Sequence, residues 1–132
     1  MIDLKIDHFG YAVSDIDRSL KIFLELGYEK ISSIVIDEIR NVKIVFIKIG
    51  NTKIELISPV NEKSPVIDYL KKNGNILYHI CYETKNIIDS ILELKKLKFR
   101  VIEKPSIAIA INSQRVAFLY HPYYGLLELL EV

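Results

Sequence analysis

The chain has 132 residues, of which 50% are hydrophobic and 27% are charged, and its formal net charge is +1. This length suits one domain, and such a chain can bury roughly two thirds of its unfolded surface. The balanced charge gives no field for nucleic acid, and no apolar run approaches the ~20 residues of a spanning helix. With no secretory signal visible, we expect a cytoplasmic protein without a nucleic-acid or membrane partner.

The first half opens with a predicted strand and helix. Residues 4–13 alternate between two faces with the period of a strand, and His8 shares its face with Ile6, Gly10 and Ala12. A helix follows that is capped by Ser14 or Asp15 and stopped by Gly27. Its apolar stripe is expected to cover one face of a sheet and consists of Ile16, Leu20, Phe23 and Leu24.

Three β-rich runs complete the first half, at residues 30–37, 42–49 and 53–58. The turn signal Gly50-Asn51 predicts that the last two runs form a hairpin. Glu55 lies inside the last run, between two apolar residues. Its side chain is therefore expected to face away from them, either to solvent or into a polar cavity.

The second half repeats this order after a connector. Ser64 and Pro65 predict the start of a short helix that ends near Asn73-Gly74. A strand, a helix and four β-rich runs then follow, at residues 76–83, 86–97, 99–103, 107–111, 115–120 and 125–131. In the last run Glu128 shares a strand face with Leu126 and Leu130, opposite Leu127 and Leu129.

The two halves are copies of one strand-then-helix unit. The stretch Ile6-Asp7-His8 returns 71 residues later as Leu77-Tyr78-His79. Toward the end of each half the offset grows slightly, and Ile54-Glu55-Leu56 corresponds to Leu127-Glu128-Leu129. One histidine therefore opens each half and one glutamate closes each half.

This duplication predicts a metal site. If the two copies pair about a pseudo-twofold axis, positions that are equivalent by duplication approach one another inside one curved sheet. The converging side chains would be His8, Glu55, His79 and Glu128. Two imidazoles and two carboxylates suit one divalent ion such as Zn, Ni, Co or Mn, and an octahedral ion would keep two positions open for a substrate.

The motifs that carry a family resemblance are Ile6-Asp7-His8, Gly50-Asn51-Thr52-Lys53-Ile54-Glu55-Leu56, Ser64-Pro65-Val66, Tyr78-His79-Ile80-Cys81, Val116-Ala117-Phe118-Leu119 and Leu127-Glu128-Leu129. Over essentially its whole length the chain resembles the vicinal oxygen chelate superfamily, which is the glyoxalase/bleomycin resistance/dioxygenase group. Within it the chain looks most like the methylmalonyl-CoA epimerases. The resemblance implies an α+β fold of two tandem βαβββ modules that form a curved mixed sheet around a metal site.

The same resemblance implies one domain over residues 1–132, with modules at about 1–60 and 76–132 and a connector helix at about 63–74. It implies His8, Glu55, His79 and Glu128 as metal ligands. The expected reaction is abstraction of a proton next to the carbonyl of an acyl-CoA or similar thioester, with Glu128 as the base and Glu55 as a second member of the proton shuttle. Modules in this superfamily also pair across chains, so a homodimer is expected.

Three alternatives stay open. A glyoxalase-type lyase acting on a hemithioacetal uses the same two histidines and two carboxylates, although Ala12 stands where that class has a glutathione-binding arginine. An extradiol dioxygenase needs only one glutamate, which leaves Glu55 unexplained. A small-molecule binding or resistance protein of this fold would not need the four ligands.

The remaining chemically active residues have simpler interpretations. Cys81 excludes an intramolecular disulfide because it is the single cysteine, and a small buried filler is expected there. His121 follows a strand and is interpreted as a turn residue. Arg40 and Arg115 either hold a substrate carboxylate or phosphate or are exposed.

Overall fold

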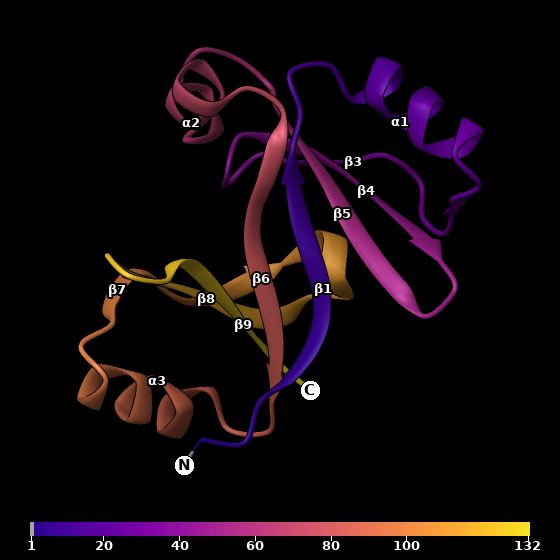
Figure 1. The fold of residues 1–132 in the computed structure, drawn as a ribbon. Helices are drawn as coiled ribbons and strands as arrows, with labels where there is room; N and C mark the ends of the chain where they lie inside the picture. Colours follow the sequence, from indigo (N-terminus) through magenta and orange to yellow (C-terminus); the bar gives the residue numbers. More distant parts are fainter. Residues whose placement is uncertain (1) are drawn as a thin grey trace. The chain divides into compact units, whose positions relative to one another are not determined.

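The computed structural model describes residues 2–132, which fold into two compact units. One unit is Phe9–Tyr78, and the other combines the residues up to His8 with His79–Val132. Each unit contains strands and a helix in the order strand, helix, then further strands (Figure 1). The α+β class with repeated βαβββ modules is therefore confirmed.

In the unit Phe9–Tyr78 the strand order is β2-β4-β5-β1, and β3 also pairs with β4. The elements are β1 (Lys5–Ala12), α1 (Ile16–Glu25), β2 (Glu29–Lys30), β3 (Val35–Asp37), β4 (Val42–Ile49), β5 (Thr52–Pro59) and α2 (Val66–Asn73). Strand β1 begins before the unit, and its last four residues pair in parallel with β5.

The other unit has the strand order β6-β9-β8-β7. Its elements are β6 (Ile76–Thr84), α3 (Ile87–Lys96), β7 (Arg100–Ala108), the 3-10 turn η1 (Ile109–Ile111), β8 (Gln114–His121) and β9 (Gly125–Glu131). The first three residues of β6 belong to the unit Phe9–Tyr78. Strand β6 pairs in parallel with β9, as β1 does with β5. The opening and closing strands of each module therefore lie side by side.

The two module helices begin in the same way. Asp15 caps α1 by accepting a hydrogen bond from the backbone N–H of Arg18 at 3.1 Å, and Asn86 caps α3 by accepting one from Asp89, also at 3.1 Å. Each cap is worth about 1 kcal/mol. Of the two residues that the sequence offered as the first cap, the structure selects Asp15.

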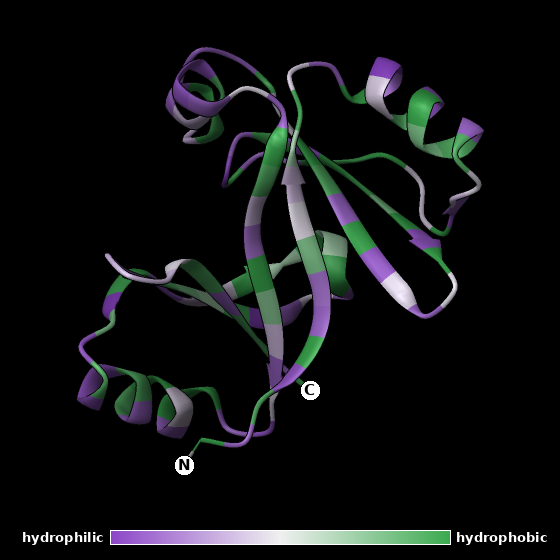
Figure 2. Cartoon of the chain, in the orientation of Figure 1, coloured by the Kyte–Doolittle hydropathy of each residue, from purple (hydrophilic) through white to green (hydrophobic). Residues whose placement is uncertain are grey.

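Each helix covers one face of its own sheet. Helix α1 contributes Ile16 and Leu20 to a core that also contains Val13, Val45, Ile47, Ile54 and Leu56. Helix α3 contributes Ile87, Ile91 and Leu94 to a core that also contains Ala117, Leu119, Leu127 and Leu129. Both helices carry hydrophobic and hydrophilic residues along their length (Figure 2). The expectation that Leu24 belongs to the apolar stripe is wrong, because its side chain is 42% exposed.

Two predicted strand boundaries are also wrong. The run 30–37 is interrupted between β2 and β3, where the hydroxyl of Ser32 accepts the hydrogen bond of the Phe46 N–H at 2.8 Å and replaces a ladder bond. The runs 99–103 and 107–111 are not two strands. Strand β7 continues through Pro105 by irregular pairing with β8 and ends at Ala108, and the turn η1 takes the remaining residues.

The connector helix α2 begins one residue later than the sequence predicts. Pro65 is the cap residue rather than the first helical residue, and the Ser64 hydroxyl still accepts a hydrogen bond from the Val66 N–H at 3.4 Å. The helix ends at Gly74, whose φ of 72° is a backbone conformation that glycine adopts easily. No helix within residues 2–132 is long and apolar enough to cross a membrane.

Candidate metal centre

His8 and His79 lie on the opening strands of the two modules. Both side chains are buried, with residue exposures of 1% for His8 and 2% for His79. Their rings meet edge to face, with the centroids 5.7 Å apart. The small residues that share the strand face of His8, Gly10 and Ala12, leave room for the imidazole on that face.

Strand pairing places Glu128 on the same face of the sheet as His79. It lies on β9 in register with Cys81 of β6, and paired residues of parallel strands project from the same face. Because His79 is two residues before Cys81, it also lies on this face. The flanking residues Leu127 and Leu129 point the other way, into the core beneath α3.

The histidine nitrogens converge on one carboxylate oxygen. Nε2 of His79 is 2.9 Å from Oε1 of Glu128, and Nε2 of His8 is 3.3 Å from the same oxygen. The side chains of all three residues are at most 4% exposed. Neutral imidazole nitrogens carry lone pairs, so their approach to a buried carboxylate is favourable only when a proton or a cation lies between them.

This donor set fits a divalent metal ion. Ligand atoms of His8, His79 and Glu128 all lie within 4.8 Å of one another, as they must to bind one ion. Imidazole nitrogen and carboxylate oxygen are the ligands that zinc, nickel, cobalt and manganese accept. The buried histidine and glutamate cluster could therefore hold a metal.

Glu55 occupies the matching position in the other unit. On β5 it lies in register with Gly10 of β1, and His8 is two residues before Gly10. The relation of His8, Gly10 and Glu55 is therefore the same as that of His79, Cys81 and Glu128. Glu55 is 4% exposed, so of the two environments that the sequence allowed for this side chain, the buried one is observed.

Asp7 is a polar neighbour of the cluster to which the sequence analysis gave no role. Its Oδ2 lies 2.7 Å from Nδ1 of His8. Strand alternation places adjacent residues on opposite faces, so the pattern gave no sign of this contact. A carboxylate next to a candidate histidine ligand is the signal that would have found it.

Cys81 agrees with its simpler interpretation as a small buried residue, and His121 lies in a strand. Cys81 is fully buried in a small cluster with Ala108, Val116 and Leu130. Its Sγ also lies within 4.8 Å of ligand atoms of Asp7 and His8. His121 is the last residue of β8 and pairs with Gly125, so its interpretation as a turn residue is wrong by one position; its Nδ1 accepts a hydrogen bond from the N–H of Tyr123 in the following turn at 3.0 Å.

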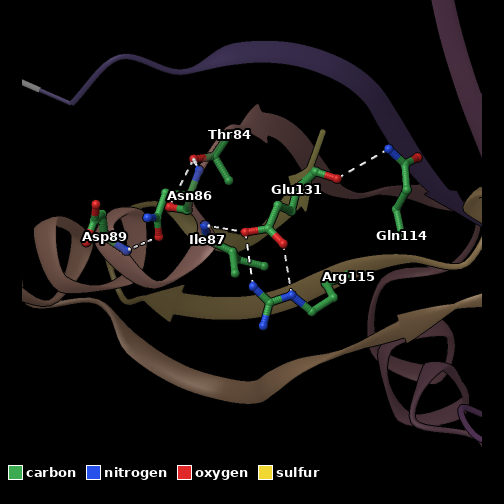
Figure 3. Close-up of polar contacts among 7 residues, drawn as sticks. All are labelled: Thr84, Asn86, Ile87, Asp89, Gln114, Arg115 and Glu131. Atoms are coloured by element: carbon green, nitrogen blue, oxygen red, sulfur yellow. Dashed lines mark hydrogen bonds and ion pairs between the residues drawn. The ribbon is translucent and has the colours of Figure 1, made fainter.

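The two arginines are engaged with carboxylates of the protein. Arg40 forms an ion pair of 2.8 Å with the buried Asp37. Arg115 donates two hydrogen bonds to Glu131, at 2.9 and 3.1 Å, and Glu131 also accepts the N–H of Ile87 at the start of α3 (Figure 3). The Arg115 guanidinium and the Ile87 N–H lower the pKa of the Glu131 carboxyl. In this structure both guanidinium groups are therefore used within the fold.

Comparison with known proteins places the chain in a family. The model of the glyoxalase/bleomycin resistance protein/dioxygenase superfamily matches residues 7–118. The chain therefore belongs to that superfamily.

Named relatives narrow this assignment. The chain is 31% identical over 119 residues to the ethylmalonyl-CoA/methylmalonyl-CoA epimerase of Cereibacter sphaeroides, covering 89% of this chain and 88% of that protein. It is 32% identical over 119 residues to the human mitochondrial methylmalonyl-CoA epimerase, covering 89% of this chain and 66% of that one, so it spans about two thirds of the longer relative. Within the superfamily, the chain belongs with the methylmalonyl-CoA epimerases.

The solved structures agree. A Streptomyces coelicolor methylmalonyl-CoA epimerase variant in complex with 2-nitronate-propionyl-CoA superimposes with a TM-score of 0.84 at 27% identity. The match covers 98% of this chain and 95% of that one. The fold predicted from the duplicated sequence is the fold of this family.

Proposed function

We propose that the protein is a divalent-metal-dependent epimerase that moves a proton next to the carbonyl of an acyl-CoA, with methylmalonyl-CoA as the first substrate to test. The observation that carries this proposal is the convergence of both histidine Nε2 atoms on Oε1 of Glu128 in a chain related to named epimerases. The complex of the Streptomyces coelicolor relative with a propionyl-CoA nitronate supports an acyl-CoA as the substrate class.

His8, Glu55, His79 and Glu128 are the proposed ligands. Support for Glu55 comes from the repeated strand register, which gives it the same place relative to His8 that Glu128 has relative to His79. The metal is one of zinc, nickel, cobalt and manganese, because nitrogen and oxygen ligands suit all four. When bound, the ion supplies Lewis-acid stabilisation of the charge that develops on the substrate carbonyl oxygen.

Glu128 is the proposed base. Epimerisation requires that the proton next to the carbonyl leave from one face of the carbon and return to the other. A carboxylate within hydrogen-bond reach of that proton can accept it and return it. Glu128 is 3% exposed, and its duplicate Glu55 is 4% exposed. We propose Glu55 as the partner that exchanges the proton at the opposite face.

Two further properties belong to the proposal. We propose that the protein works as a homodimer, since modules of this superfamily also pair across chains, and that it acts in the cytoplasm. A glyoxalase-type lyase is the alternative reaction of the same ligand set, and no contact in residues 2–132 favours it. Its hemithioacetal substrate therefore serves as the contrasting arm of the test.

The test combines metal analysis with two substrates. The protein is purified without an affinity tag or added metal, its divalent metals are measured by elemental analysis, and solvent deuterium incorporation is followed by NMR. Metal near one equivalent together with deuterium uptake into methylmalonyl-CoA is expected. Turnover of the glutathione–methylglyoxal adduct without exchange in acyl-CoA substrates would establish the lyase instead. A protein that takes up none of the four metals on titration contradicts both reactions.

A further inference from the structure

One of the proposed ligands, His8, has a close contact with a residue outside the ligand set, Asp7. Oδ2 of Asp7 is 2.7 Å from Nδ1 of His8, a distance typical of a strong hydrogen bond to a charged group. The His8 side chain is fully buried, and that of Asp7 is 10% exposed. Both residues and Glu128 belong to the same compact unit.

With Asp7 ionised, this contact requires a proton on Nδ1 of His8. An ionised carboxylate only accepts hydrogen bonds, so the proton of the contact belongs to Nδ1. A neutral imidazole has one N–H, and its lone pair is then on Nε2. Nε2 is the atom that faces Oε1 of Glu128 at 3.3 Å. Asp7 thus directs the lone pair of His8 toward the candidate metal centre.

The second half of the chain lacks this arrangement. The residue before His79 is Tyr78, which has no carboxylate and packs edge-on against Tyr69, with centroids 4.7 Å apart. The ring of His79 packs edge-on against Phe118, at 5.4 Å. Both halves therefore carry the histidine, but only the first half has an acidic residue directly before it.

We propose that Asp7 is a positioning residue that fixes His8 as the Nδ1–H tautomer and strengthens its Nε2 as a metal ligand. This inference rests on the proposed function, because it concerns the metal centre of that same site. A carboxylate that accepts the second N–H of a histidine ligand orients the ring and raises its basicity, and its loss typically costs about 10- to 100-fold in metal affinity.

The competing explanation is that Asp7 itself binds metal. Ligand atoms of Asp7, His8 and Cys81 lie within 4.8 Å of one another, so these three residues form a second candidate group. The two arrangements exclude each other, because an Nδ1 that donates to Asp7 has no lone pair for an ion. Cobalt distinguishes them, since cobalt bound by a thiolate has a charge-transfer absorption that nitrogen and oxygen ligands lack.

The experiment compares Asp7→Asn with Asp3→Asn, an exposed carboxylate on the same N-terminal segment. Nitrogen-15 NMR of the metal-free protein reports the tautomer of its three histidines, and a variant with His8→Gln assigns the signals. Titration against a chromophoric chelator gives the metal affinity, and thermal unfolding of the metal-free protein reports any structural effect.

We expect the Nδ1–H tautomer at His8 in the parent, a mixture of tautomers in Asp7→Asn, and metal affinity about 10- to 100-fold lower in Asp7→Asn than in Asp3→Asn. A lower unfolding temperature with tautomer and affinity unchanged would show a structural role and overturn the inference. A cobalt–thiolate absorption that is lost in Cys81→Ser would also overturn it. A parent that binds no metal refutes the proposed function as well, whereas equal affinity in both variants refutes only the role of Asp7.

Discussion

Replacement of Glu128 by glutamine tests the proposed base. Glutamine keeps the size of the side chain and an oxygen near the two Nε2 atoms, which lie 2.9 and 3.3 Å from Oε1, but it cannot accept the substrate proton. Loss of a general base typically lowers kcat about 10²- to 10⁴-fold, which corresponds to about 2.7–5.5 kcal/mol in the barrier. We therefore expect kcat for methylmalonyl-CoA to fall by at least about 100-fold.

The assay follows epimerisation and deuterium incorporation in the same sample, with metal content measured before and after. Only metal-saturated protein is compared, so that loss of a ligand is not mistaken for loss of the base. Glu93→Gln, an exposed change on α3, is the control and should match the parent. Glu128→Gln with full metal and activity within tenfold of the parent would refute the assignment of Glu128.

The same substitution at Glu55, the duplicate of Glu128, distinguishes proton exchange from inversion. If Glu55 delivers the proton at the second face, Glu55→Gln should still incorporate deuterium at the face served by Glu128 but should lose inversion. Equal loss of exchange and inversion in both variants would instead mean that each glutamate acts mainly as a metal ligand. The two substitutions are chemically identical at positions that are equivalent by duplication, and each therefore controls for the other.

Three further predictions concern the fold around the site. Leu129→Ala should lower the free energy of unfolding by about 3–5 kcal/mol in urea titrations, because this side chain is fully buried under α3, whereas the exposed Leu92→Ala should change it by less than about 0.5 kcal/mol. The pKa of Glu131 is lowered in the folded protein, so its contribution to stability is present above the ordinary glutamate pKa and is lost as the pH falls through the lowered pKa. Glu131→Gln should therefore reduce stability at pH 7 and make stability depend less on pH in the acid range. An unchanged pH profile of stability would contradict this. The pKa of Tyr124 is raised mainly by burial and secondly by the 2.6 Å contact with the Tyr82 hydroxyl. Tyr82→Phe should therefore lower the pKa of Tyr124 toward its ordinary value without reaching it, as measured by spectrophotometric titration. A rise in that pKa would contradict the role of the Tyr82 contact.

The sequence was sufficient to predict the fold because the pattern that is duplicated, the spacing of hydrophobic residues within each strand and helix, can be read from short segments. The spacing of hydrophobic residues placed Leu127 and Leu129 on one face of β9 and Glu128 on the other, and the structure confirms both placements. Strand ends were less predictable, since they depend on partners elsewhere. The interruption after β2 follows from one hydroxyl of Ser32 bonding to a neighbouring strand, and composition alone does not reveal such a bond.

Side-chain contacts between near neighbours were the other source of error. Alternation assigned Asp7 to the face opposite His8, yet its carboxylate reaches the His8 ring. Arg115 carried no signal of its partner, because Glu131 lies 16 residues beyond Arg115 and is brought beside it by the β8–β9 hairpin. Periodicity predicts the direction of a Cα–Cβ bond, whereas the far end of a long polar side chain is placed by charge.

The duplicated halves differ at the residue in register with each glutamate, and this difference bears on which glutamate is the base. Gly10 lies opposite Glu55 and has no side chain, whereas the fully buried Cys81 lies opposite Glu128. A side chain packed beside a carboxylate limits its rotamers, and a bare glycine does not. Glu128 is therefore expected to be held more rigidly than Glu55. A base that must meet the same carbon atom in every turnover gains from that rigidity, because misplacement of a reacting group by about 1 Å can cost 100-fold in rate. Cys81→Gly should therefore lower kcat more than it lowers metal affinity, and equal losses in kcat and affinity would argue against this division of roles.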